Sequence, residues 1–289
     1  MAEWGNSSIF GALFVRKMVL KIIICLIAFI VFLKLFVYYY ERKLIYFPFS
    51  IIESTPDAMN MKYEDVYFVT ADAVRLNGWF ISAPESIATI IYCHGNAGNI
   101  SHRVDKIKMF YDKHISVFAF DYRGYGRSEG NPNEQGLYYD GEAAYYYLVR
   151  KRKMNPAEIV LFGESIGSAV ASYIAQHHQI KALILEAPFT NARDMSRRIL
   201  PFLPVQWFVT IQMDNVKMLD KVQTPVLVIH GTDDDIVPFE LGRQLYDSLP
   251  SSKKRFLEIS GAGHNDVAYI DGNRYFETIR QTILHKTVE

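Results

Sequence analysis

One short stretch constrains this 289-residue chain more than any other: Gly163-Glu164-Ser165-Ile166-Gly167, between a short apolar run and a segment of small residues. The order of the residues predicts a strand, a sharp turn and a helix, which is the arrangement of a nucleophile elbow. The two glycines have no Cβ, so the strand and the helix can approach closely while the serine adopts a strained backbone. Because Gly-x-Ser-x-Gly also occurs by chance, its interpretation depends on the rest of the chain.

Short β-branched runs alternate with helix-like segments through most of the sequence. The predicted strands are 63–70, 74–81, 88–92, 117–120, 159–162, 182–185, 226–229 and 255–259. The predicted helices are 101–113, 134–150, the segment after Ser165, 239–248 and 271–284. This alternation predicts an α/β fold with a mostly parallel eight-stranded sheet flanked by helices. Ligands of such sheets bind beyond the carboxyl ends of the strands.

Two loops that follow predicted strands carry groups able to activate a serine. The first contains Asp233, Asp234 and Asp235, and the second contains His264. Both loops should reach the sheet edge where Ser165 lies, and the order serine, acid, histidine is that of the α/β-hydrolase triad. His264 would accept the serine proton, and an acid would fix the imidazole tautomer. The residues themselves leave the choice among the three aspartates open.

An oxyanion hole is expected beside the serine. One donor would be the backbone N–H of Ile166, and the other that of Asn96, in a loop of small residues after the strand 88–92. We interpret His94, which begins this loop, as structural rather than as a catalytic base. His230 and the five remaining histidines have no catalytic partner pattern and are given no role.

These motifs resemble the α/β-hydrolase superfamily, and the resemblance spans residues 88–266. The acid loop of that superfamily reads Gly-x-x-Asp-x-x-Val-Pro, and residues 231–238 fit it only with Asp234 as the acid. His-Gly-Asn-Ala-Gly-Asn at 94–99, Asp-Tyr-Arg-Gly-Tyr-Gly-x-Ser-x-Gly at 121–130 and Gly-Glu-Ser-Ile-Gly at 163–167 are similar to the Bem46-like branch. That branch includes membrane-anchored serine hydrolases and the ABHD13 and ABHD17 types. The resemblance implies no metal and no cofactor.

The glycine-rich loop 121–130 lacks the Lys-Ser/Thr ending of a phosphate-binding loop, so a phosphate site is rejected there. We expect it to buttress the active site, with Arg123 and Tyr125 at its rim. The segment 188–224 interrupts the alternation of strands and helices and is expected to form a short lid. Its apolar residues either line an acyl pocket or hold the lid on the sheet. The tentative pocket residues are Phe189, Leu200, Phe202, Trp207 and Phe208.

The N-terminus contains an apolar run, 18–40, long enough to cross a bilayer as a helix. It divides the chain into a tail (1–17), a transmembrane anchor (18–40), a connector (41–60) and a catalytic domain (61–289). A signal peptide and a buried helix are the alternatives, but no small-residue cleavage site and no amphipathic face is visible. A slight excess of basic residues before the run favours a cytoplasmic N-terminus.

Net charge and cysteine content exclude some kinds of partner and site. A formal net charge of +0 gives no reason to expect nucleic acid, and the two cysteines, Cys25 and Cys93, fit neither a disulfide nor a metal pattern. The sequence therefore predicts a membrane-anchored serine hydrolase that cleaves esters or thioesters of an apolar, lipid-like acyl substrate. A serine peptidase or amidase on the same fold is the second hypothesis, and a non-catalytic hydrolase-like binding protein is the third.

Overall fold

The central element of the fold is an eight-stranded sheet in the order β10-β9-β8-β7-β4-β6-β3-β2. The computed structural model describes residues 4–199, 201–202, 204–250 and 252–285. The sheet strands are β2 (Glu64–Val69), β3 (Arg75–Ile81), β4 (Ala88–Cys93), β6 (Ile115–Phe120), β7 (Ile159–Glu164), β8 (Ala182–Glu186), β9 (Val226–Gly231) and β10 (Lys254–Ile259). Among the described strands of this sheet, the pairs β2–β3 and β3–β6 are antiparallel and the other neighbours are parallel. The predicted fold class, a mostly parallel eight-stranded sheet, is confirmed.

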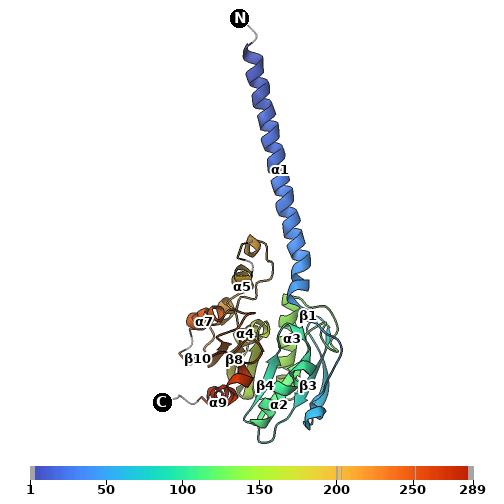
Figure 1. Cartoon of the computed structure of the whole chain (residues 1–289). Coiled ribbons are helices and arrows are strands. Elements are labelled where there is room, and N and C mark those ends of the chain that lie inside the picture. Colours follow the sequence, from blue (N-terminus) through green and yellow to red (C-terminus); the bar gives the residue numbers. More distant parts are fainter. Residues whose placement is uncertain (1–3, 200, 203, 251, 286–289) are drawn as a thin grey trace.

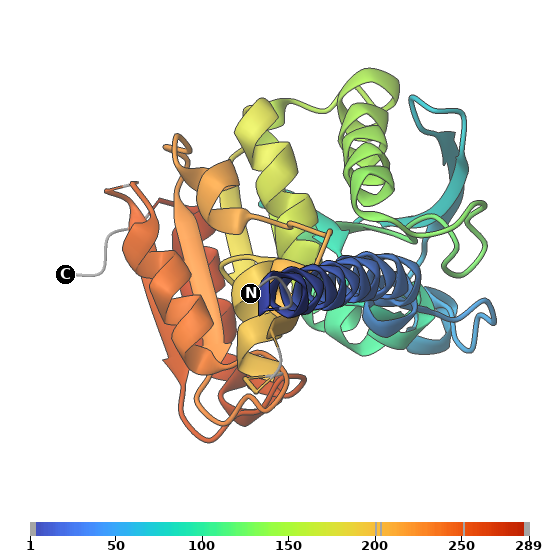
Figure 2. The ribbon, with the colours of Figure 1, turned by 90° about the horizontal axis from the view of Figure 1, so that it is seen from above.

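Helices cover both faces of the sheet (Figure 2). One face packs against α3 (Glu134–Tyr146), α4 (Gly167–His177) and α7 (Phe239–Ser248), and the other against α2 (Val104–Asp112) and α9 (Gly272–Ile283). Burial on both faces explains why β4, β6, β7 and β8 read as continuous runs of buried residues rather than alternating ones. Shorter helices are α5 (Ala192–Ile199), α6 (Asn215–Leu219) and α8 (Val267–Ile270).

Several short segments complete the chain. The single-turn helices are η1 (Pro56–Met59), η2 (Ile100–Arg103), η3 (Tyr147–Lys151), η4 (Pro156–Glu158) and η5 (Pro204–Trp207). A separate two-stranded parallel sheet joins β1 (Phe47–Pro48) to β5 (Ala97–Gly98). This small sheet fastens the segment after the N-terminal helix to the loop that follows β4.

The N-terminal helix α1 (Trp4–Ile45) is 42 residues long and projects away from the part of the chain that contains the sheet (Figure 1). Its stretch Leu13–Ile45 is long and apolar enough to cross a membrane, and its apolar side chains are exposed rather than buried in the domain. At a rise of about 1.5 Å per residue, a helix of this length is longer than the roughly 30 Å thickness of a bilayer core. The helix therefore extends beyond the predicted anchor at both ends, into the predicted tail and connector.

The glycine-rich loop after β6 is held by a buried ion pair. Arg123 is 5% exposed, and its Nε and Nη2 donate to Asp140 Oδ1 at 2.9 and 2.8 Å. Its Nη1 donates to Asp72 Oδ2 at 2.8 Å. The expected rim position of Arg123 and Tyr125 is wrong: both side chains are buried, because the fully buried Asp140 requires a cationic partner and Tyr125 supports the loop after β4.

We predict that Arg123→Ala lowers the free energy of unfolding by about 3 kcal/mol or more, since it leaves Asp140 buried without its partner. The matched control is Arg127→Ala, in the same loop, which removes an exposed ion pair to Asp65 at 2.9 Å and should cost less than about 1 kcal/mol. Thermal unfolding of both variants in detergent measures the difference. Equal losses of stability would contradict the assigned role of Asp140.

Candidate active site

Ser165 lies at the sharp turn between β7 and α4 in a left-handed conformation, with φ at +53°. Its N–H donates to the carbonyl of Glu186, in β8, at 2.9 Å. A Cβ on Gly167 would lie 2.0 Å from the carbonyl oxygen of Cys93, and one on Gly163 would lie 2.6 Å from the carbonyl oxygen of Gly167. Both positions therefore exclude any side chain, which accounts for the two glycines of the motif.

Asp234 and His264, which come from the loops after β9 and β10, are in contact: Nδ1 of His264 lies 2.8 Å from Oδ2 of Asp234. The other oxygen of Asp234 accepts the N–H groups of Ile236 and Val237 at 2.9 and 2.8 Å. Burial opposes the ionisation of Asp234, but hydrogen bonds from His230, His264 and Val237 outweigh it and hold the pKa of Asp234 well below its usual range. An ionised, fixed carboxylate is what orients an imidazole.

The neighbouring aspartates have different surroundings. Asp233 and Asp235 are exposed, whereas Asp234 is 8% exposed. Asp233 accepts the hydroxyl of the adjacent Thr232 at 2.8 Å. Of the three aspartates, the structure brings Asp234 to His264.

His230, to which the sequence analysis gave no role, also contacts the acid. Its Nε2 lies 3.2 Å from Oδ2 of Asp234 and 2.9 Å from the carbonyl oxygen of Val237. Since a carbonyl only accepts, Nε2 carries the proton and donates between these two oxygens. The signal in the sequence is its place near the end of β9, four residues before Asp234.

The hydroxyl of Ser165 makes no hydrogen bond to any residue in the described part of the chain. Ser165 and His264 follow β7 and β10, two strands whose carboxyl ends meet at the same edge of the sheet. Hydrogen bonds between a nucleophile and its base are often long before substrate binds and tighten in the complex. The lack of a Ser165 hydrogen bond in the free protein therefore does not exclude His264 as its base.

The two expected oxyanion donors lie beside Ser165, and Asn96 and Ile166 line the same pocket. Neither backbone N–H donates to an acceptor among the described residues. The carbonyl of Asn96 accepts the Phe47 N–H at 3.0 Å and the Tyr125 hydroxyl at 2.8 Å. These bonds hold the peptide that directly follows the expected donor.

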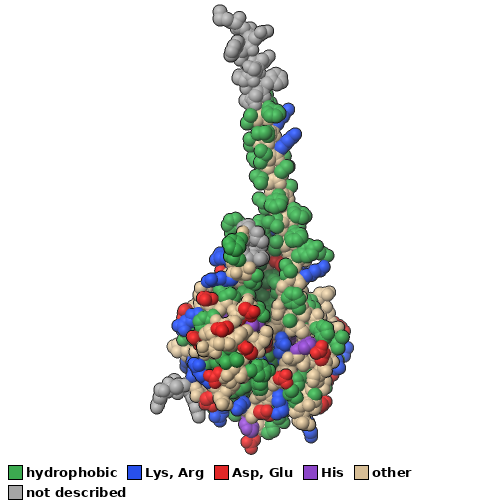
Figure 3. Space-filling model, viewed as in Figure 1, with side chains coloured by type: hydrophobic (Ala, Val, Ile, Leu, Met, Phe, Trp, Pro, Cys, Tyr) green, Lys and Arg blue, Asp and Glu red, His purple; other side chains and the backbone are tan. Residues whose placement is uncertain are grey.

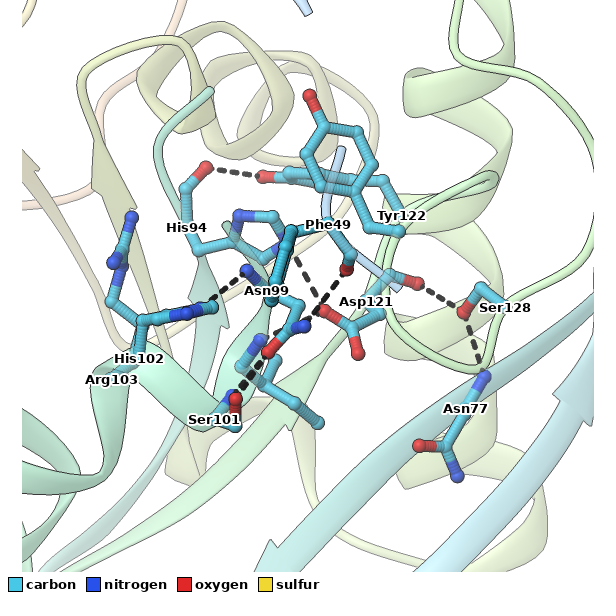
Figure 4. Close-up of polar contacts among 12 residues, drawn as sticks. Phe49, Asn77, His94, Asn99, Ser101, His102, Arg103, Asp121, Tyr122 and Ser128 are labelled. Atoms are coloured by element: carbon cyan, nitrogen blue, oxygen red, sulfur yellow. Dashed lines mark hydrogen bonds and ion pairs between the residues drawn. The ribbon is translucent and has the colours of Figure 1, made fainter. Parts of the chain in front are cut away.

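A mostly buried polar network joins the segment after β4 to the loop after β6 (Figure 4). Asn99 donates to the carbonyl of Phe49 at 2.8 Å, and Asp121 accepts the Ile100 N–H at 2.9 Å. His94 is 1% exposed with its Nε2 3.7 Å from Asp121, and burial lowers the pKa of His94 to about 3. A neutral, enclosed imidazole supports the structural interpretation of His94.

Burial raises the pKa of Asp121 to about 7, far above its value in an unfolded chain of about 3.9. The folded state therefore binds an extra proton between these two values, so this carboxyl loses its stabilising contribution as pH rises through 7. We predict that Asp121→Asn, which cannot ionise, gains stability relative to wild type as pH rises from 5 to about 8.5. Thermal unfolding of both proteins across that range tests this; a constant difference in melting temperature would contradict it.

A cluster of buried charges lies beneath the serine, and the sequence analysis missed it. Lys106 Nζ contacts Glu186 Oε1 at 2.6 Å and Glu164 Oε2 at 3.6 Å, and Arg103 Nε lies 3.7 Å from the same Glu164 oxygen. Burial opposes ionisation of Glu164, but Lys106 and Arg103 lower its pKa to about 2. Two cations thus balance two carboxylates next to Ser165, and removal of any one partner would leave a buried charge unpaired.

A pocket of about 360 Å³ opens at Ser165. Most of its lining side chains are apolar, and they come from the end of α1, α5, the lid segment 209–213, the loop after β9 and positions near Ser165. They are Leu44, Ile45, Phe47, Ile166, Phe189, Ala192, Met195, Ile199, Val209, Ile211, Met213, Ile236 and Val237. Glu41, Asn96, Ser165 and Ser196 complete the lining.

The tentative pocket residues fall into three groups. Phe189 lines the pocket, and Leu200 lies outside the described residues. Phe202, Trp207 and Phe208 are not in the wall, and the first two are 95% and 76% exposed. The reason is geometric: Ala192, Met195 and Ile199, on one face of α5, already form the wall on the lid side.

The sequence of the chain matches a known protein family and several of its members. The family described as serine aminopeptidase, S33, matches residues 84–210 and 205–267. Protein bem46 of Schizosaccharomyces pombe is 36% identical over 84% of this chain and 86% of its own. An uncharacterized membrane protein of Saccharomyces cerevisiae is 33% identical over 86% of this chain and 90% of its own. The chain belongs to the Bem46-like α/β hydrolases.

Solved structures agree on the fold of this hydrolase. The Pyrococcus furiosus esterase Pf2001 superposes with a TM-score of 0.70, at 20% identity, over 83% of this chain and 98% of its own. At that identity the likeness concerns the fold alone. No group of three or more metal-binding side chains occurs within the described residues of this Bem46-like hydrolase.

Proposed function

We propose that this Bem46-like hydrolase is a membrane-anchored serine hydrolase that cleaves ester or thioester bonds of apolar acyl substrates through an acyl-enzyme. Ser165 Oγ attacks the acyl carbon while His264 Nε2 takes its proton, and Asp234 holds the imidazole through Nδ1. The N–H groups of Asn96 and Ile166 donate to the oxyanion. His264 then protonates the leaving alcohol or thiol, and water releases the acyl group.

The observation that carries the proposal is the position of Ser165 in the wall of a pocket whose lining is mostly apolar. Such a lining favours an acyl chain over a charged or polar substrate. The 2.8 Å contact of His264 with Asp234 supplies the base and its orienting acid. Both features support acyl transfer through Ser165.

A serine peptidase or amidase is the second candidate, because the matched family is described as a serine aminopeptidase. Parallel assays on matched acyl esters, thioesters and anilides separate the candidates. Faster turnover of the anilide, at equal acyl chain, would favour the amidase. Faster turnover of the ester or thioester would favour our proposal.

Labelling by a fluorophosphonate probe tests the nucleophile. We expect wild type to be labelled and Ser165→Ala to be unlabelled, because the probe reacts with an activated serine. Ser196→Ala, which removes the hydroxyl of another serine in the pocket wall, should leave the labelling in place. An unlabelled wild type would favour a non-catalytic binding protein, and labelling of Ser165→Ala would move the nucleophile elsewhere.

We propose that residues 18–40 are retained as the membrane anchor, rather than removed as a signal sequence. The support is that α1 continues without a break into Glu41, Leu44 and Ile45, which line the pocket. The protein should stay in the membrane pellet after carbonate extraction with an N-terminal tag intact. Loss of the tag, or release into the supernatant, would contradict the anchor.

A further inference from the structure

The end of the anchor helix is part of the active-site pocket. Glu41, Leu44 and Ile45, in the last turns of α1, line the pocket that holds Ser165. Phe47, in the short strand that follows, lines it as well. The helix that would leave the bilayer thus forms one wall of the substrate site.

Two sets of hydrogen bonds fix this arrangement. Glu41 is 6% exposed, and its carboxylate accepts both the N–H of Thr210, at 2.9 Å, and the Thr210 hydroxyl. This joins α1 to the lid segment. On the other side, the side-chain amide of Asn96 donates to the carbonyl of Ile45 at 3.0 Å, and the Phe47 N–H donates to the carbonyl of Asn96. The end of α1 therefore contacts both the lid and Asn96, the residue whose N–H is proposed to bind the oxyanion.

The mouth of this pocket is apolar and exposed. We define the mouth as Leu44, Phe47, Ile199 and Ile236, which line the pocket and are 71%, 49%, 59% and 48% exposed. Large apolar side chains gathered at one opening indicate an interaction surface rather than a face left in water. The mouth includes α1 itself, so it lies where that helix meets the domain.

The lid adds further exposed apolar side chains beside α1. We define the lid tip as Phe202 and Trp207, which are 95% and 76% exposed. Figure 1 shows the lid reaching up alongside the lower part of α1, and Figure 3 shows hydrophobic side chains on the lid and on α1 with a hollow between them. The outer face of α5 carries the exposed cations Arg193, Arg197 and Arg198. Exposed aromatic side chains next to cations are typical of segments that lie in a lipid interface.

We propose that the mouth and the lid tip rest in the same bilayer leaflet that α1 enters, so that Ser165 receives the acyl chains of lipids directly from that membrane. This proposal rests on the proposed hydrolase function for its chemistry, but the docking of the lid tip does not. The occupant of the apolar surface is the bilayer, because the surface is continuous with a helix whose length and composition fit a membrane span.

The docking is tested on the full chain in phosphatidylcholine proteoliposomes, in a Cys25→Ser background. An environment-sensitive dye is attached to Phe202→Cys or, as a control, to Val69→Cys on β2, which is also apolar and 59% exposed. Lipids brominated on the acyl chain should quench the dye at position 202 at least about twofold more than the dye at 69, since such quenching requires contact with the acyl region. Equal quenching at the two positions would overturn the docking.

The delivery of substrate is tested with a second pair of variants. Phe202→Ser with Trp207→Ser should slow hydrolysis of a long-chain ester embedded in the same vesicles by about tenfold, because docking loses most of its apolar contact. Hydrolysis of a short water-soluble ester and fluorophosphonate labelling should stay within about twofold of wild type, since neither depends on the bilayer. The control, Tyr67→Ser with Val69→Ser, removes two exposed side chains of β2 and should change neither activity.

The outcomes distinguish failure of the membrane-docking proposal from failure of the proposed hydrolase function. Loss of both activities in the lid-tip variant, with labelling also lost, would overturn the membrane role and make the tip part of the pocket or of the fold. An unchanged rate on the embedded ester would overturn delivery from the bilayer. If wild type hydrolyses neither ester and takes no label, the hydrolase function fails and delivery of acyl chains to Ser165 fails with it, while quenching at position 202 would still support docking.

Discussion

Replacing Asp234 with asparagine is expected to lower kcat/KM for ester hydrolysis by about 10⁴-fold, the magnitude known for the equivalent change in a serine protease. The Oδ1 atom of Asp234 accepts the N–H groups of Ile236 and Val237, so an asparagine would keep its carbonyl oxygen there. Its NH₂ group would then face Nδ1 of His264, in place of the acceptor that lies there at 2.8 Å. The imidazole would be forced to carry its proton on Nε2 and could no longer accept one from Ser165.

The matched controls are Asp233→Asn and Asp235→Asn. Both carboxylates are exposed, so each change should leave kcat/KM within about twofold of wild type. Initial rates with a soluble acyl ester, on protein whose melting temperature has been checked, give the comparison. A large effect at Asp233 or Asp235, or a small one at Asp234, would show that the acid has been assigned to the wrong residue.

The sheet, and the order of the groups along its edge, could be predicted from the sequence because the signals are local. Runs such as Ala88–Cys93 are buried on both faces and read as strands wherever they occur. The loops after β7, β9 and β10 meet at one edge because the strands are parallel. That argument alone brought the loops of Ser165, Asp234 and His264 to the same edge.

The composition of the pocket wall could not be predicted in the same way, because it depends on contacts between distant segments. The prediction ended the anchor at Tyr40, where the charged Glu41 follows. In the structure Glu41 is satisfied by Thr210, 169 residues away, so the helix continues into the pocket. For the same reason, the sequence could not predict which apolar lid residues line the pocket. Hydrophobicity does not separate Met195, which faces the pocket, from Phe202, which faces outward.

The largest loss of activity is expected at Ser165 itself. Ser165→Ala and Ser165→Gly should both lower turnover of an acyl ester by more than about 10⁴-fold, since each removes the only atom that can form the acyl-enzyme. The two variants should differ in stability. At φ +53° an alanine keeps the strain of the native serine, whereas a glycine adopts this conformation without cost.

We therefore expect Ser165→Gly to be more stable than Ser165→Ala by up to about 1 kcal/mol, after allowing for the greater freedom of glycine in the unfolded chain. Unfolding of the two inactive proteins in detergent measures this difference directly. If the alanine variant is the more stable, the strained turn does not cost stability, and the sharp bend at Ser165 would need another explanation. If the glycine variant is the more stable, holding the Ser165 hydroxyl at the pocket costs the protein stability. Such strain is expected at a catalytic residue and not at a chance Gly-x-Ser-x-Gly motif.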